Sequence, residues 1–357
     1  MQKIYPFFAT CFAALFSTVA SAQDPVFSQF YANRMYLNPA FTGLEQGLAI
    51  NAQARTHWTL IPGQYNIAFV SADIQEPMLK SGFGFTAWQF SQGDAGLTTQ
   101  SVALNYAYVL PLTSERTKNT HNLHFGLRAG ITSRFIDWTK LTFSDQLDPV
   151  SGVTYSTNAV PIDYKVSFFD ADFGVVWRSE TNWLGNGTRS SLGVSWNHIP
   201  RQDESLLGIV TRRPWRWTLH GGLEIPVNWI DGAARRQIAW SPNFKVDLQE
   251  NLTTLGIGVY AIYETVYMGA MYQDRALAFS PLNTNSIIFC LGYKAKINKG
   301  QSLLVGYSFD ANTSGLSVRT GGSHEIALRY NLADVQLFRQ GVHDKKGKRI
   351  LNCKAFF

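Results

Sequence analysis

Only two groups of residues in this sequence have the types and spacing that acid–base or nucleophilic chemistry would need. Asp170 and Asp172 could form a carboxylate pair, and Ser323 with His324 could form a nucleophile and its base. Alternate residues of a strand share a face, however, so Asp170 and Asp172 are explained more simply by ion pairing inside a barrel. The sequence offers no positioned partner for Ser323 and His324. We therefore predict that the protein is not an enzyme.

Motifs for metals, nucleotides and redox cofactors are missing from the sequence. The 7 histidines are scattered, and no HExxH, GxSxG, P-loop or Rossmann pattern is present. Beyond the N-terminal apolar run, which contains Cys11, only Cys290 and Cys353 remain, so one disulfide is possible. We predict no metal, no cofactor and no nucleic-acid partner.

Residues 1–22 have the pattern of a secretory signal peptide. Lys3 supplies a positive start, residues 4–19 are mostly apolar, and Ala20-Ser21-Ala22 matches the small-residue cleavage pattern. We predict cleavage between Ala22 and Gln23. The alternative, a membrane anchor, needs roughly 20 apolar residues, more than this run has.

The composition of the chain favours a membrane β-barrel. Aromatic residues make up 14% of the chain and charged residues only 16%, and there are 29 glycines. No run after residue 22 approaches the 18 consecutive apolar residues of a membrane helix. Barrel strands carry their apolar groups on alternate positions, so they need no such run. We predict an all-β, antiparallel transmembrane barrel of the outer membrane.

Period-two alternation begins near residue 47 and continues to residue 332, which we take as the barrel. In the clearest strand, residues 215–227, one face holds Trp215, Trp217, Leu219, Leu223, Ile225 and Val227, and the other holds Arg216, Thr218, His220, Gly222 and Glu224. We predict that Trp217, Leu219, Trp240 and Phe244 face lipid. About 14 strands are expected, starting near residues 48, 64, 82, 99, 122, 168, 189, 215, 236, 252, 266, 285, 302 and 323.

The connections between these strands predict the orientation of the barrel. If the first strand runs outward, residues 136–166 and 199–214 become the long extracellular loops, and Glu264-Thr265 becomes a short periplasmic turn. Long loops outside and short turns inside are the normal asymmetry of bacterial barrels, which also keep both termini in the periplasm.

The lumen face is polar and nearly balanced in charge. Its basic residues are Arg55, Arg128, Arg134, Arg216, Lys245, Lys294 and Arg329, and its acidic residues are Asp170, Asp172, Glu224, Asp247, Asp310 and Glu325. Opposite charges in nearly equal number favour internal pairing over a strongly ion-selective pore. We therefore predict a plugged or side-chain-filled lumen rather than an open channel, although barrels of this size can be either.

Two segments flank the barrel. Residues 23–46 form an N-terminal arm in which Phe27, Phe30, Tyr31 and Met35 recur at helical spacing, and Asn38-Pro39 should end any helix. Residues 333–357 form a basic tail on the periplasmic side. Its candidate partner-binding residues are Arg339, Lys345, Lys346, Lys348, Arg349, Phe356 and Phe357. A solvated tail or a signal for barrel assembly are the alternatives.

Arg55, His57 and Trp58 lie where the first strand meets the first extracellular loop. They form a candidate extracellular rim for binding. The alternative for Trp58 is an aromatic residue at the membrane interface, where tryptophan is common.

Several motifs together resemble the PorP/SprF family. They are Gln23-Asp24-Pro25-Val26-Phe27-Ser28-Gln29-Phe30-Tyr31, Asn38-Pro39-Ala40-Phe41-Thr42-Gly43, Arg55 with Trp58 and Pro62, Gly306-Tyr307-Ser308-Phe309-Asp310, Gly322-Ser323-His324-Glu325-Ile326-Ala327-Leu328-Arg329-Tyr330, and Cys353 near an aromatic end. The ending Cys353-Lys354 departs from the family, where Cys-Pro is commoner.

The resemblance covers essentially the whole mature chain and implies an outer-membrane component of the type IX secretion and gliding-motility machinery of Bacteroidota. The partners that it implies are periplasmic and outer-membrane secretion components and a secreted cargo or adhesin, besides membrane lipid. It supplies no catalytic residues. The alternative function is an outer-membrane pore for small solutes.

Overall fold

The computed structural model describes residues 24–335 except 94–95, 114–118, 149, 159–163, 183–186, 207, 209, 232–233, 251, 278–284 and 314–316. For residues 228–231, 234–237, 276–277 and 317–318 only the backbone is described. The predicted cleavage site at Ala22 and Gln23 lies outside the described residues, as does Cys353. The tail residues Arg339, Lys345, Lys346, Lys348, Arg349, Phe356 and Phe357 lie outside them too.

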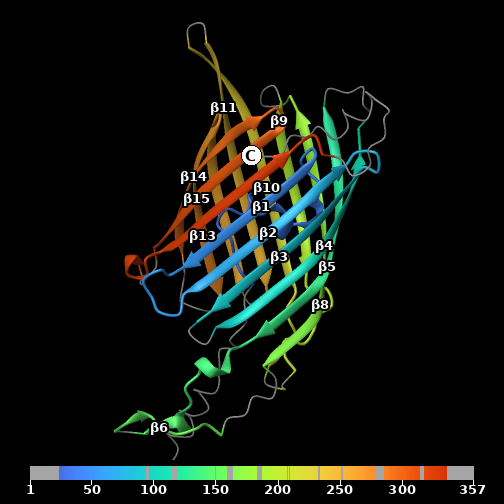
Figure 1. The fold of residues 1–357 in the computed structure, drawn as a ribbon. Coiled ribbons are helices and arrows are strands. Elements are labelled where there is room, and N and C mark those ends of the chain that lie inside the picture. The colour runs from blue at the N-terminus through green and yellow to red at the C-terminus, as the bar shows by residue number, and fades with distance from the viewer. Residues whose placement is uncertain are drawn as a thin grey trace, which may run out of the picture.

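A closed antiparallel barrel of 14 strands makes up most of the described chain (Figure 1). The strands, in chain order, are β1 (Leu48–His57), β2 (Tyr65–Glu76), β3 (Ser81–Gln92), β4 (Leu97–Pro111), β5 (Thr120–Phe135), β8 (Lys165–Thr181), β9 (Thr188–Asn197), β10 (Arg216–Asp231), β11 (Ala234–Gln249), β12 (Leu252–Tyr263), β13 (Val266–Leu277), β14 (Ser286–Asn298), β15 (Gln301–Asn312) and β16 (Ser323–Leu332).

The first and last strands close the barrel. β1 pairs with β16 along its whole length, from Leu48 opposite Leu332 to His57 opposite Ser323. Closure leaves no open sheet edge at membrane depth, where unpaired backbone groups would cost several kcal/mol each. The predicted fold class is therefore confirmed, and each predicted strand starts within three residues of an observed one.

The connections differ between the two ends of the barrel. The end with the long connections, here called the loop end, carries residues 136–164 and 198–215 between strands. The other end, here called the turn end, has two-residue connections such as 264–265 and 299–300. The usual asymmetry of bacterial barrels predicts an extracellular loop end and a periplasmic turn end. β16 ends at the turn end, so the tail begins there.

The longest loop has some structure of its own, which the sequence did not predict. It holds two 3-10 turns, η2 (Trp138–Lys140) and η3 (Ser144–Gln146), and a small hairpin of β6 (Leu147–Asp148) and β7 (Gly152–Val153). Figure 1 shows it projecting well away from the barrel.

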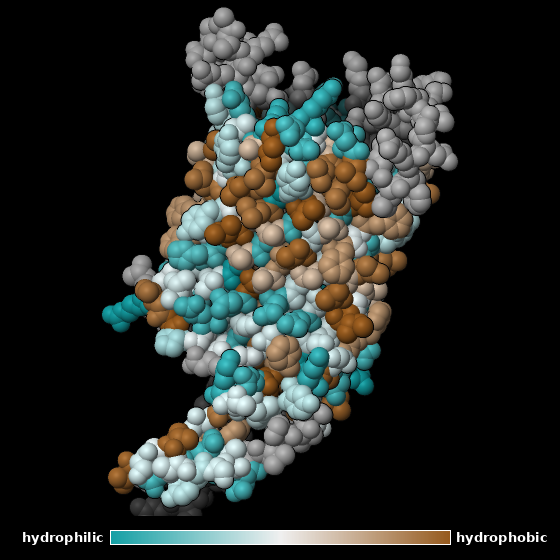
Figure 2. Space-filling model, viewed as in Figure 1, coloured by the Kyte–Doolittle hydropathy of each residue, from teal (hydrophilic) through white to brown (hydrophobic). Residues whose placement is uncertain are grey.

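The outer wall is apolar because the strands alternate. Along β4, Val102, Leu104 and Tyr106 are exposed, whereas Ala103 and Asn105 between them are buried. Figure 2 shows many apolar side chains on the barrel wall. Trp217, Leu219 and Trp240 are all exposed on this wall, and Phe244 is partly exposed, as the lipid-facing prediction requires. Among the described residues, no helix is long and apolar enough to cross a membrane.

The arm before β1 lies inside the barrel (Figure 1, dark blue). It contains one short helix, α2 (Arg34–Leu37), followed by a 3-10 turn, η1 (Pro39–Phe41). Asn38 is extended between them, so Asn38-Pro39 does end the helix as predicted. The aromatic residues before Arg34 are not helical; their spacing reflects packing against the surrounding wall.

Candidate functional site: an arm-filled lumen

The bore of the barrel is filled by the arm. Arm residues with 7% exposure or less include Phe27, Ser28, Gln29, Phe30, Tyr31, Ala32, Asn33, Met35, Leu37, Asn38, Ala40, Phe41, Thr42 and Leu44. Asp24 lies among loop-end residues such as His198, whereas Gly47 lies against Leu332 at the turn end, so the arm spans the bore. This confirms the prediction of a plugged lumen.

Aromatic side chains of the arm pack against aromatic side chains of the wall. Tyr31 contacts Tyr260 and Tyr267 edge-to-face, with ring centroids 4.7 and 6.0 Å apart. Phe27 meets Phe69 in the same geometry at 6.1 Å. Edge-to-face pairs contribute about 0.5–1.5 kcal/mol each beyond the burial of their area. The arm is thus held by a core of its own inside the barrel.

Close contact between arm and wall depends on glycines in the strands. A Cβ atom on Gly174 of β8 would lie 2.0 Å from Asn38 Oδ1, and one on Gly126 of β5 would lie 2.1 Å from the backbone nitrogen of Ala40. No real side chain tolerates such distances, so glycine is required at both positions. The Asn38-Pro39-Ala40 segment therefore sits directly on the backbone of the wall.

Asn38 is fully buried and satisfied at that contact. Its side-chain nitrogen donates to the carbonyl of Val194 at 3.0 Å, and its oxygen accepts from the backbone N–H of Ala40 at 2.9 Å. The hydroxyl of Ser195 donates to the carbonyl of Leu37 at 3.0 Å. These bonds give the buried arm backbone the partners that it needs in a water-poor lumen.

Glu325 of β16 is the anchor of the upstream half of the arm. Its carboxylate accepts the backbone N–H groups of Ser28 and Gln29, both at 2.8 Å, and it is fully buried. Arg55 donates to the same carboxylate at 2.9 Å and to Asp310 at 2.5 Å. The carboxylate of Glu325 therefore both neutralises Arg55 on the wall and holds the arm.

Glu45 holds the downstream end of the arm. It pairs with Arg34 at 3.0 Å and with Arg329 at 3.2 Å, and Arg329 also donates to the carbonyl of Ala32 at 2.9 Å. Burial raises the pKa of Glu45, but Arg329 and Arg34 outweigh it and hold this pKa below its ordinary value. Burial, aided by the nearby Arg329, lowers the pKa of Arg34 to about 9.

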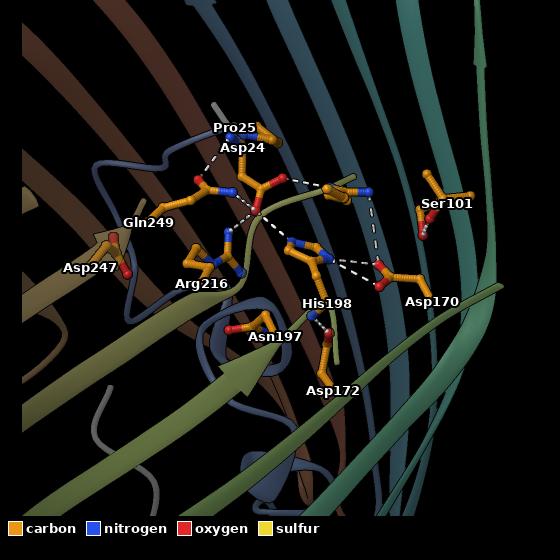
Figure 3. A network of polar contacts seen from close by, with 12 residues as sticks. Asp24, Pro25, Ser101, Asp170, Asp172, Asn197, His198, Arg216, Asp247 and Gln249 are labelled. Atoms are coloured by element: carbon orange, nitrogen blue, oxygen red, sulfur yellow. Dashed lines mark hydrogen bonds and ion pairs between the residues drawn. The ribbon is translucent and has the colours of Figure 1, made fainter. Parts of the chain in front are cut away.

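Asp24 occupies the centre of a charged network at the loop end (Figure 3). Its carboxylate contacts Arg213 at 2.5 Å, His198 Nε2 at 2.6 Å and Arg216 at 3.2 Å. His198 Nδ1 faces Asp170 at 3.0 Å. The arm and three separate parts of the barrel meet at this point.

Opposing charges set the pKa values in this network. Burial raises the pKa of Asp24, but attraction by Arg213, His198 and Arg216 outweighs it, and the net pKa lies well below the ordinary carboxyl range. Burial and Arg213 lower the pKa of His198, yet Asp24 and Asp170 outweigh them and the net pKa is raised. The network therefore favours the ionised form of Asp24 and the protonated form of His198.

Asp170, Asp172 and His198 are close enough together to be considered as metal ligands. Their surroundings argue against a cation. Arg128 donates to Asp172 at 2.8 Å and to Asp170 at 3.4 Å, and the backbone N–H of His198 donates to Asp172 at 2.9 Å. These donors already occupy the carboxylate oxygens that a metal ion would need. The pairing predicted for Asp170 and Asp172 is thus confirmed.

Ser323 and His324 point to opposite faces of β16 and cannot act together. Ser323 is buried in the lumen, whereas His324 lies on the outer face and contacts the hydroxyl of Tyr307 at 2.7 Å. Ser323 instead meets His57 Nδ1 at 2.9 Å. Arg55 also contacts this imidazole, with its Nε 2.7 Å from His57 Nε2 and its Nη2 3.4 Å from His57 Nδ1. The geometry is not that of a nucleophile and its base.

Comparison with known proteins places the chain in a family. Residues 19–330 match the model of the type IX secretion system membrane protein PorP/SprF. The chain belongs to the PorP/SprF family. A closed barrel with an apolar outer wall in a membrane-protein family is a protein of the outer membrane, because closed barrels and helices are the only structures that span a bilayer. No curated protein sequence matches the chain significantly.

Solved structures similar to this PorP/SprF protein are outer-membrane barrels. Omp33 of Acinetobacter baumannii is 9% identical, with 82% of this chain and 99% of that chain covered and a TM-score of 0.39. The COG4313 channel of Pseudomonas putida F1 is 10% identical, with 81% and 95% covered and a TM-score of 0.38. The toluene transporter TodX of P. putida is 10% identical, with 83% and 92% covered and a TM-score of 0.38.

The residues predicted as an extracellular rim of the PorP/SprF barrel are separated by the structure. Arg55 is 3% exposed and belongs to the lumen contacts described above. His57 and Trp58 are partly exposed at the loop end, where Trp58 packs edge-to-face on Tyr65 at 5.1 Å. A binding role for this rim stays a prediction.

The lumen charges mostly form the pairs expected from their balance. Besides the pairs above, Arg134 meets Glu204 at 3.1 Å, Lys245 meets Asp247 at 2.8 Å, and Arg189 meets Glu224 at 2.8 Å. Lys294 differs, because it is exposed at the turn end.

Sequence reasoning missed the arm residues that complete the lumen contacts, namely Asp24, Ser28 and Glu45, and the loop residues His198 and Arg213. The signal available for them was indirect: Gly126 and Gly174 stand on the lumen face of strands, where only a close backbone approach requires glycine.

Proposed function

We propose that this PorP/SprF protein is a non-enzymatic outer-membrane component of type IX secretion that anchors or receives secretion partners and their cargo. On this view the barrel acts as a docking body rather than as a conduit. The partners are periplasmic and outer-membrane secretion components, and the cargo is a secreted protein such as a gliding adhesin.

The observation that carries this proposal is the arm-filled lumen. Buried ion pairs of Asp24 and Glu45, together with two arm N–H groups that donate to Glu325, hold the arm in the bore. Breaking a buried pair by removing one partner costs about 3–5 kcal/mol. A channel for solutes would have to displace the arm against several such contacts, which disfavours the pore as the alternative function.

The basic tail is the proposed contact for periplasmic partners. β16 ends at Leu332 at the turn end, which we propose faces the periplasm. The candidate contacts are Arg339, Lys345, Lys346, Lys348, Arg349, Phe356 and Phe357. Exposed charges are screened within about 8 Å at physiological ionic strength, so the basic contacts should weaken with salt. Each terminal phenylalanine could contribute about 1.5–3 kcal/mol if a partner buries it.

The test is a mild-detergent purification from native membranes, comparing the full chain with a chain that ends at Leu332. We expect type IX components to co-purify with the full barrel and to be lost, together with cargo secretion, from the shortened one. A shortened chain that fails to insert would make the tail an assembly signal and overturn its docking role. Two results together would contradict the proposed function: the full barrel retains no type IX component, and cells that lack the barrel still secrete cargo.

A further inference from the structure

The hairpin of β10 and β11 extends beyond the rim of the barrel at the turn end (Figure 1). The two strands pair with each other as far as Asp231 opposite Ala234. β9 stops pairing with β10 much earlier, at Arg189 opposite Glu224, and β12 stops pairing with β11 at Tyr263 opposite Ile238. The end of the hairpin therefore stands free of both neighbouring strands.

The free edge is longer on β10 than on β11. Among the described strands, residues 225–231 of β10 pair only with β11, and residues 234–237 of β11 pair only with β10. Within the described part of the chain, no other backbone hydrogen bond reaches residues 225–231. At about 3.3 Å per residue, the β10 edge extends roughly 23 Å past the last pair with β9.

Such an edge has defined chemistry. A strand edge presents a row of backbone N–H and C=O groups that can pair with another extended chain, and proteins usually shorten, cover or interrupt such edges. Pro226 removes one donor near the start of this edge, but residues 227–231 contain no further proline. Adding a strand to an exposed edge is a recurring way of binding an extended peptide.

A second copy of the chain is a poor occupant of this edge. Two copies in one membrane share their orientation, so a symmetric pair has its two-fold axis along the membrane normal. Each residue of the edge would then face itself across the axis. In a parallel pair, when one residue bonds across the ladder, the N–H and C=O groups of the residue directly opposite point away, so a residue cannot bond to its own copy. An antiparallel pair needs strands that run in opposite directions, which this symmetry does not give. Symmetry therefore favours a different polypeptide.

We propose that the β10 edge at residues 225–231 binds an extended segment of a periplasmic polypeptide as an added β-strand. The segment needs about five to seven extended residues without an internal proline, because each missing N–H would remove a bond of the ladder. This inference rests on the proposed function, since it supplies the site at which a periplasmic secretion component joins the barrel.

Hydrogen–deuterium exchange of the whole barrel, purified from native membranes with and without its co-purifying secretion components, tests the proposed ladder. We expect exchange of the amides in residues 227–231 to slow at least tenfold in the complex, while residues 264–265 at another turn stay unchanged. Unchanged exchange at residues 227–231 in a complex that contains those components would overturn the proposal.

A shortened hairpin provides the second measurement. Replacing residues 226–239 by Asn-Gly joins Ile225 to Trp240, which face each other, through a turn suited to a two-residue hairpin. The control replaces Glu264-Thr265 by Asn-Gly in the β12–β13 turn. Both variants should form heat-modifiable barrels, but only the first should lose the periplasmic components, at least tenfold.

The outcomes separate the two proposals. Equal retention of secretion components by both variants sinks the added-strand inference and leaves the proposed function standing. The proposed function itself would be overturned if no type IX components co-purify with the unaltered barrel and cells that lack the barrel secrete normally. A hairpin-to-hairpin dimer, seen as self-crosslinking that the shortened variant lacks, would also overturn the inference.

Discussion

At the scale of single residues, the lumen is organised by a few buried carboxylates that serve the wall and the arm at once. Glu325 illustrates the principle, because it neutralises Arg55 on the wall and accepts two backbone N–H groups of the arm. Asp24 and Glu45 are carboxylates of the arm itself, and they pair with arginines near or on the wall. The charge balance of the lumen is thus complete only when the arm is seated.

Replacement of Glu325 should loosen the arm. Glu325→Gln keeps the shape but removes the charge that Arg55 needs and one of the two oxygens that accept arm N–H groups. Hydrogen bonds to charged groups contribute about 1.5–3 kcal/mol, so the temperature of heat modification should fall clearly. The matched control is Glu264→Gln in an exposed turn. Equal melting of the two variants would contradict the anchoring role.

The network around His198 should make the arm sensitive to alkaline pH. The folded-state pKa of His198 is raised, so its stabilising contribution is present below the ordinary imidazole pKa and is lost as the pH rises through the raised value. The pKa of Asp24 is lowered, so its contribution is lost only in strong acid. The start of the arm should therefore be held less tightly once the pH rises through the raised pKa of His198.

Labelling at the start of the arm measures this loosening. A maleimide reagent is applied to Val26→Cys in a Cys353→Ser background, and each rate is normalised to that of the denatured protein at the same pH. The rate should rise several-fold on the alkaline side. With His198→Gln added, labelling should be fast and independent of pH there. A flat profile with His198 intact would argue against the network.

At the scale of elements, the arm and the barrel wall are shaped for each other through glycine. Gly126 and Gly174 let the Asn38-Pro39-Ala40 segment reach the strand backbone, and Asn38 then bonds carbonyls of β8 and β9. This contact is steric as well as polar, so it should be intolerant of any side chain.

Gly174→Ala tests the steric part of that contact. Its new Cβ would lie 2.0 Å from Asn38 Oδ1, so the arm must shift or leave the lumen. Gly256→Ala on β12 is the control, because its Cβ would have 3.6 Å to the nearest atom, Met271 Sδ. Protease should cut the arm in the first variant and spare it in the second. Resistance of both arms would show that the wall can yield at Gly174.

The strands were predictable from the sequence, whereas the place of the arm was not. Alternation is a local signal, and it fixed the strands because lipid and lumen demand opposite chemistry on neighbouring residues. The contact between Ser28 and Glu325 joins residues 297 positions apart, and no periodicity reports such a pairing. The spacing of Phe27, Phe30, Tyr31 and Met35 indicated burial correctly but suggested a longer helix than α2.

At the scale of the whole molecule, the barrel is a wall between lipid and a packed interior. Leu219 is 45% exposed on the lipid side, whereas its neighbour Thr218 is 2% exposed and donates to Asp247 at 2.6 Å. A charged substitution on the outer face is therefore disfavoured by lipid, whereas a larger side chain on the lumen face is disfavoured by the packed interior.

A charge on the lipid face should reduce barrel assembly. Arginine at the bilayer midplane costs about 2–4 kcal/mol in such barrels, so Leu219→Arg should lower the yield of heat-modifiable protein in the outer membrane. Val210→Arg in the loop between β9 and β10 is the control, because Val210 is 70% exposed outside the strands. Normal yield from Leu219→Arg would refute the assignment of this face to lipid.

The measurement that tests the central claim most directly is the conductance of the purified barrel in planar lipid bilayers, with and without residues 24–44. The account predicts no stable conductance from the intact protein, because the arm fills the bore, and large stable conductance once the arm is deleted. Large steady currents through the intact protein, together with solute uptake that is lost when it is absent from cells, would contradict the account and favour a transport pore.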